Sequence, residues 1–156
     1  MTGKTMGWVV TAVAAVAVAA TPVNAQSARI SATELAIRLE AEAVRLQVTS
    51  DGWADAASLY VAAAGHRQHE DPQARQDLFT AANLYYQVGD MSRAMSALES
   101  AGTRALASGD SVLAVQMFAN AALVAQEAGL RNDERRLRSR AADVAYTAEP
   151  SGPTTS

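Results

Sequence analysis

The chain has 156 residues, a formal net charge of -3 and no cysteine. This length accommodates one small domain, and the lack of cysteine excludes a disulfide scaffold, an iron–sulfur cluster and a cysteine nucleophile. Hydrophobic residues make up 49% of the chain, aromatic residues only 5%, and the sequence pI is near 5.3. Such a chain lacks the basic footprint of a nucleic-acid-binding protein, so we expect no nucleic acid partner.

The N-terminus has the three-part layout of a secretory signal peptide. Lys4 precedes an uncharged, almost wholly apolar run, Met6–Ala20, which Pro22 interrupts before a short segment that ends at Ala25. This pattern predicts a signal peptide over residues 1–25 with cleavage between Ala25 and Gln26. The mature protein is then exported, to the periplasm or the exterior of a bacterial cell.

The same segment allows one alternative, a retained membrane anchor. A spanning helix needs about 20 apolar residues, and Met6–Ala20 is shorter than that. In this alternative the protein is a structural subunit of a membrane complex, held by its uncleaved N-terminal helix. A membrane partner is expected only in that case.

Capping residues, glycines and apolar periodicity predict a short linker over residues 26–30 and then six helices, with no strand. The first helix opens at a capping box, Ser31 and Glu34. The predicted helices run from there to Val48, from Trp53 to Gly65, from Pro72 to Val88, from Met91 to Ala107, from Ser111 to Ala128, and from a cap at Asn132 to Tyr146. Residues 147–156 contain two prolines and no bulky apolar side chain, so we expect a disordered tail.

An internal repeat links these helices. Gly89 is preceded by small and large residues at set offsets, and the same offsets recur before Gly129. The matched residues are Leu78, Ala81, Ala82 and Tyr85 in the first set, and Phe118, Ala121, Ala122 and Ala125 in the second. Small residues at fixed places let antiparallel helices approach closely, and stacked copies bury each other's apolar faces.

The segment Leu78-x2-Ala81-Ala82-x2-Tyr85-x3-Gly89-Asp90-x3-Ala94-x3-Leu98-x2-Ala101 resembles the core signature of the tetratricopeptide-repeat family. The resemblance implies a short right-handed α-solenoid of about three antiparallel helical hairpins over residues 31–146. The period is longer than the family's usual one. The last helix is rich in arginine, as a solvent-facing cap would be. The alternative is an ordinary six-helix bundle around one centre.

In that family the first helix of each hairpin lines a concave groove that holds a peptide or helix of a partner protein. Matching positions place the candidate groove residues on the third and fifth predicted helices. They are Gln76, Phe79, Asn83, Tyr86, Gln87, Gln116, Ala119, Leu123, Gln126 and Glu127. Because adjacent helical residues lie about 100° apart, Tyr85 and Tyr86 cannot both be buried, and we expect Tyr86 to be exposed.

No pattern indicates catalysis, a cofactor or a metal. His66 and His69 have the spacing of metal ligands, but they fall in a predicted loop, where spacing defines no geometry. The basic cluster from Arg131 to Arg140 is interpreted as a solvated helix face, with docking to an acidic partner as the alternative. The sequence therefore predicts a non-enzymatic scaffold that binds a protein or peptide. Self-association through an exposed end of the stack stays open.

Overall fold

In the computed structural model, residues 30–148 form an all-α structure. The predicted signal peptide, its cleavage position between Ala25 and Gln26, and residues 149–156 of the predicted tail lie outside the described residues. The helices are α1 (Ala32–Leu46), η1 (Ser50–Gly52, a short 3-10 helix), α2 (Trp53–Gly65), α3 (Pro72–Gln87), α4 (Met91–Ala107), α5 (Ser111–Glu127) and α6 (Arg131–Ala148).

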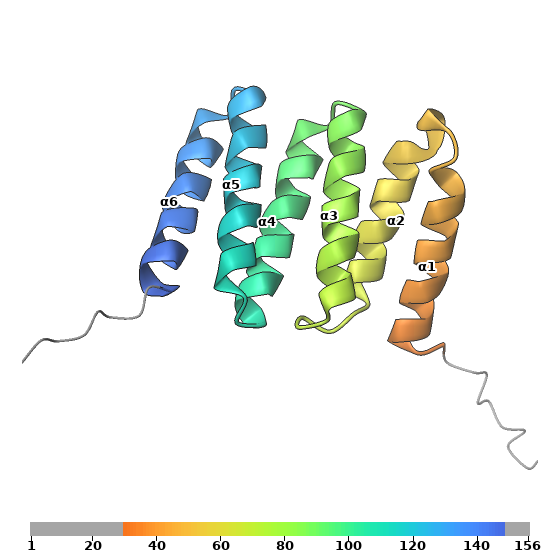
Figure 1. Ribbon diagram of the computed structural model, residues 1–156. Coiled ribbons are helices and arrows are strands. Elements are labelled where there is room, and N and C mark those ends of the chain that lie inside the picture. The colour runs from red at the N-terminus through yellow and green to blue at the C-terminus, as the bar shows by residue number, and fades with distance from the viewer. Residues whose placement is uncertain (1–29, 149–156) are drawn as a thin grey trace, which may run out of the picture.

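The six α-helices stand side by side in one row, and each runs antiparallel to the next (Figure 1). Each packs mainly against its neighbours in sequence, and α3 and α5 lie in front of α4 in this view. The described helices therefore do not converge on a single centre. The predicted fold class, an all-α stack of three helical hairpins, is confirmed, and the six-helix bundle is wrong.

Three glycines make the tight turns that build this row. Gly89, Gly109 and Gly129 have φ angles of 78°, 79° and 72°. Residues other than glycine rarely adopt this backbone conformation. Asp90 and Asp110 follow the first two glycines, and each carboxylate accepts a hydrogen bond of 3.0 Å from the first turn of the next helix. Two residues thus end one helix and begin another, as the sequence predicted.

The third of these turns differs, because Leu130 stands where the others have aspartate. The Leu130 carbonyl accepts from the Glu134 amide at 2.9 Å, so α6 begins at Arg131 on backbone bonds alone. The predicted cap at Asn132 is wrong: this residue lies inside the helix, and its side chain accepts from Arg135 at 2.8 Å.

Other helix ends move by one or two residues. The last helix continues to Ala148, so the predicted start of the tail at residue 147 is two residues early. The first helix ends at Leu46 rather than Val48, because the chain turns there into η1. The third and fifth helices each end one residue before the prediction, because the glycine turn uses that residue.

The core consists mainly of alanine, with a few large side chains between the helix crossings. The matched alanines of the repeat are buried, and so are Tyr85, Leu98 and Phe118. The Phe118 ring is fully buried beneath the Arg140 guanidinium, 4.3 Å from the ring centroid. It also lies against Gly102 of α4, where a Cβ atom would meet the ring at 2.8 Å. Small residues therefore determine how near α4 and α5 can lie.

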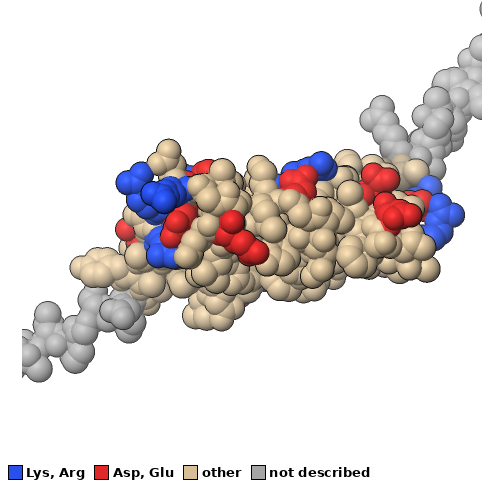
Figure 2. Space-filling view, turned by 90° about the horizontal axis from the view of Figure 1, so that it is seen from above, with Lys and Arg blue, Asp and Glu red and all other residues tan. Residues whose placement is uncertain are grey.

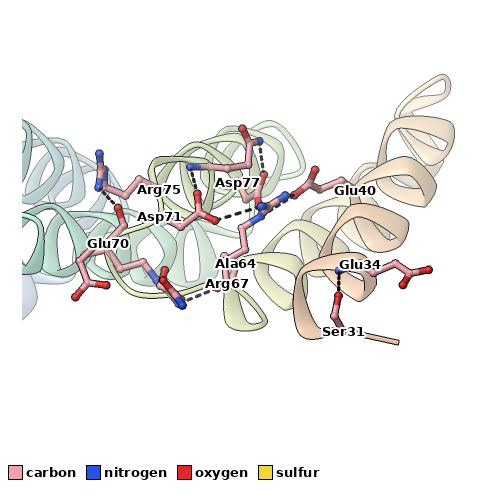
Figure 3. A network of polar contacts seen from close by, with 12 residues as sticks. Ser31, Glu34, Glu40, Ala64, Arg67, Glu70, Asp71, Arg75 and Asp77 are labelled. Carbon is pink, nitrogen blue, oxygen red and sulfur yellow. Dashed lines mark hydrogen bonds and ion pairs between the residues drawn. The ribbon is translucent and has the colours of Figure 1, made fainter. Parts of the chain in front are cut away.

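A buried ionic cluster joins the first hairpin to α3 (Figure 3). Arg67 follows α2, and its side chain is only 9% exposed. Its guanidinium pairs with Glu40 of α1, with Asp71 at 3.2 Å and with Asp77 of α3 at 3.4 Å. Three carboxylates thus share one cation where contacts between α1 and α3 are otherwise sparse.

Asp77 is the member of this cluster whose negative charge is least well compensated. Its carboxyl group is 1% exposed, and one oxygen, Oδ2, has no hydrogen-bond partner among the described residues. Burial, together with the nearby Glu40 carboxylate, raises the pKa of Asp77 to about 6, although Gln73 and Arg67 act in the opposite direction. The charged form of Asp77 therefore opposes folding at neutral pH.

We expect Gly102→Ala to destabilise the protein by about 1–3 kcal/mol, because the new methyl group overpacks the Phe118 ring. This loss exceeds the roughly 1 kcal/mol that alanine adds over glycine inside a helix. Gly65→Ala is the matched control, since nothing lies within 4 Å of its Cβ position. Urea unfolding measures both. Equal or higher stability of Gly102→Ala would contradict the close packing of α4 on α5.

We expect stability to depend on Asp77 between pH 4 and pH 8. The pKa of Asp77 is raised on folding. The stability that protonated Asp77 contributes is therefore fully present below pH 3.8 and is lost as the pH rises through about 6. Asp77→Asn mimics the protonated form, so its stability relative to the wild type should increase across this range by about 2–3 kcal/mol. Urea unfolding at several pH values tests this. Asp143→Asn, at an exposed position of α6, is the control. Parallel profiles for wild type and Asp77→Asn would exclude a raised pKa.

Candidate functional site

An open groove runs between α3 and α5, with α4 as its floor. It contains two adjoining cavities of about 390 and 380 Å³, and Phe79 lines both. The first is lined by Phe79, Ala82, Asn83, Tyr86, Leu98, Asn120, Leu123, Val124 and Glu127. The second is lined by Pro72, Arg75, Gln76, Phe79, Ala101, Leu113 and Met117. We call these two cavities together the α3–α5 groove.

Six of the predicted site residues line this groove. They are Gln76, Phe79, Asn83, Tyr86, Leu123 and Glu127. The other predicted residues, Gln87, Gln116, Ala119 and Gln126, are exposed but line neither cavity. On α3 the predicted positions therefore fall in the groove almost completely, whereas on α5 only two of them do.

The α5 wall has other residues because of how equivalent helices face each other. Positions that match between repeats point in the same direction on α3 and on α5. A groove between two helices, however, is lined by opposite sides of them. Besides the predicted Leu123 and Glu127, the α5 wall therefore includes Leu113, Met117, Asn120 and Val124, spaced three or four residues apart. This helical spacing was visible in the sequence, but the side of α5 that faces α3 was not.

The two adjacent tyrosines of α3 diverge as predicted. Tyr85 is buried, and its hydroxyl lies 2.9 Å from that of Ser58 on α2. Tyr86 is 38% exposed at the groove rim, and its hydroxyl donates to the two carboxylate oxygens of Glu127 at 3.0 and 2.9 Å. The hydrogen bond to Glu127 raises the pKa of the Tyr86 hydroxyl. Tyr86 and Glu127 thus bridge the two walls at one end of the groove.

The lining of the α3–α5 groove is mainly apolar, with several uncharged polar side chains and few charges. The side chains of Gln76, Asn83 and Asn120 have no hydrogen-bond partner within residues 30–148, so their donors and acceptors are available to a ligand. Seen from above, charged side chains gather over the two ends of the row, with a smaller group of both signs between them (Figure 2). Apart from Arg75 and Glu127, the residues that line the groove itself are uncharged.

The basic cluster of α6 is largely engaged in ion pairs. Arg136 and Arg140 both contact Glu99 of α4, which lowers the pKa of Glu99 chiefly through its hydrogen bond to Arg136. Arg138 contacts Glu134 at 2.9 Å and Gln126 of α5 at 2.9 Å. These contacts hold α6 against the stack, while Leu137 on its inner side is fully buried. The arginine-rich face of α6 is therefore more than a solvated surface, because its arginines also attach α6 to α4 and α5.

Other kinds of site find little support in the described part of the chain. His66 and His69 are exposed, and within residues 30–148 no group of three metal-ligating side chains is arranged to hold a metal ion. None of the six described α-helices is both long enough and apolar enough to cross a membrane.

No family model, no curated protein and no solved structure matches this chain. The fold itself defines the class: an α-solenoid-like stack of helical hairpins, with an open groove between its second and third hairpins.

Proposed function

We propose that this protein is a non-enzymatic interaction module of the tetratricopeptide-repeat type, which binds a segment of a partner protein in the α3–α5 groove. One observation carries the proposal. Residues placed on α3 by the repeat pattern line a groove with an exposed aromatic ring and with amides that have no hydrogen-bond partner within residues 30–148. The arginine cluster on α6 is a weaker candidate, because several of its side chains are already paired.

Binding in this groove combines two kinds of contact. Phe79, Tyr86 and Leu123 offer apolar area that a partner's side chains can cover, and aromatic side chains lose little entropy when they are immobilised. The amides of Asn83 and Asn120 can bond to the polar groups of the partner. Since the walls are packed helices, the site is preorganised and little of the binding free energy is spent on ordering it.

We further propose that the module acts outside the cytoplasm, after removal of residues 1–25. This part of the proposal rests on the sequence of the N-terminal segment. Binding of a partner by a rigid groove needs no nucleotide or other cofactor, which suits an exported protein.

We expect Tyr86→Ala to weaken partner binding at least tenfold while changing stability little, because Tyr86 lies on the rim rather than in the core. Leu123→Glu should act similarly. Val61→Glu is the control, an exposed apolar position on α2 outside the groove. Pull-down from the source organism's envelope fraction, followed by titration of the captured partner, measures the effect. If the Tyr86 and Val61 variants retain the partner equally well, the groove is not the binding site.

We expect mass spectrometry of the protein purified from its own cells to give a chain that starts at Gln26. This mass follows from cleavage after Ala25. A chain that retains Met1 would contradict export by cleavage. It would favour instead the alternative function, a structural subunit of a membrane complex anchored by residues 6–20.

A further inference from the structure

The α3–α5 groove has one charged side chain near each end, and neither has an ionic partner within residues 30–148. The Glu127 carboxylate is held by the neutral hydroxyl of Tyr86. At the other end, the Arg75 guanidinium donates to the Glu70 carbonyl at 3.3 Å and to the Ser108 hydroxyl at 2.9 Å. Both charges are therefore fixed in place by neutral groups, and both remain uncompensated.

We propose that the occupant of the groove is an extended peptide segment with one cationic and one anionic side chain about five residues apart. The cationic side chain pairs with Glu127, the anionic side chain pairs with Arg75, and the residues between them are uncharged. This inference rests on the proposed function and specifies the chemistry of the partner.

The separation of the two charges follows from helix geometry. Tyr86, which holds Glu127, comes 11 positions after Arg75 in the same helix. At a rise of 1.5 Å per residue, these positions lie about 16 Å apart along α3. An extended chain advances about 3.3 Å per residue, so about five residues span this distance. A peptide helix would need about 11 residues to connect the same two charges.

The amides between the two charges favour an extended backbone. Gln76 and Asn83 are seven positions apart on α3, and Asn120 and Glu127 are seven apart on α5. Seven helical residues rise about 10 Å, which corresponds to about three residues of extended chain. An extended peptide presents unpaired backbone N–H and C=O groups at these intervals, whereas a helix has already paired its own.

Charge recognition by this groove can act in specificity as well as affinity. In a given chain direction, a peptide with the opposite order of charges would place like charges together at both ends, and such juxtaposition disfavours wrong partners. The uncharged middle, over Phe79, excludes charged residues that would lose water without gaining a partner.

Selection of random 12-residue displayed peptides on the immobilised full chain tests the proposal. The wild type should enrich peptides in which Lys or Arg lies four to six residues from Asp or Glu. Glu127→Lys should lose the basic preference, and Arg75→Glu should lose the acidic one. Asp143→Lys, an exposed carboxylate on α6, is the matched control and should select as the wild type does.

A synthetic peptide from the wild-type selection should bind Glu127→Lys at least tenfold more weakly and Asp143→Lys without change. The charge-reversed peptide should bind the double variant E127K/R75E better than it binds the wild type. Transferred nuclear Overhauser effects should show the bound peptide to be extended.

The experiment distinguishes failure of this inference from failure of the proposed function. Peptides that bind the wild type in a Tyr86-dependent way, but without the charge spacing or as helices, would overturn this inference and leave the groove as the binding site. No enrichment above the bare surface, or enriched peptides that bind Tyr86→Ala as tightly as the wild type, would overturn this inference and the proposed function together.

Discussion

The structure depends on the absence of side-chain bulk where neighbouring helices cross. Alanine at these crossings, and Gly102 opposite Phe118, let each helix lie close to the next, so the chain builds a row instead of a globule. The few large side chains, such as Tyr85 and Phe118, fill the spaces that remain between crossings. A row has two broad surfaces and no closed centre, and a groove between alternate helices follows from this arrangement.

Equivalent positions in successive repeats serve different purposes. Asp77 on α3 and Met117 on α5 precede the glycine turns by the same 12 positions. Asp77 is buried in the ionic cluster around Arg67, which joins α1 to α3, whereas Met117 helps to line the groove between α3 and α5. One interval of the stack is therefore closed by charges, and the next is left open to a ligand. Buried ion pairs of this kind contribute little net stability, and the raised pKa of Asp77 is consistent with that.

The groove owes its character to what its rigid walls leave unsatisfied. Three amides have no partner within the described residues, and Glu127 and Arg75 are held by neutral groups. These are the features of a surface that gains most when a ligand with complementary charges and free backbone groups covers it. The ion pairs of Glu99 with α6, in contrast, satisfy the charges at that end of the stack. The proposed function places binding where polar groups remain available.

The helices, most of their ends and the buried small residues could be predicted from the sequence, because glycine turns, aspartate caps and methyl-sized side chains act locally. It also placed the α3 wall of the groove, since the repeat positions there point toward α5. Three features could not be predicted in this way: the side of α5 that faces α3, the contacts of Arg67 with Glu40 and Asp77, and the start of α6 without a cap at Asn132. These features depend on contacts between residues distant in the chain, and on how far each helix is rotated when it packs. A periodic pattern reports that a helix has a buried side, but it does not report which neighbour lies beside it.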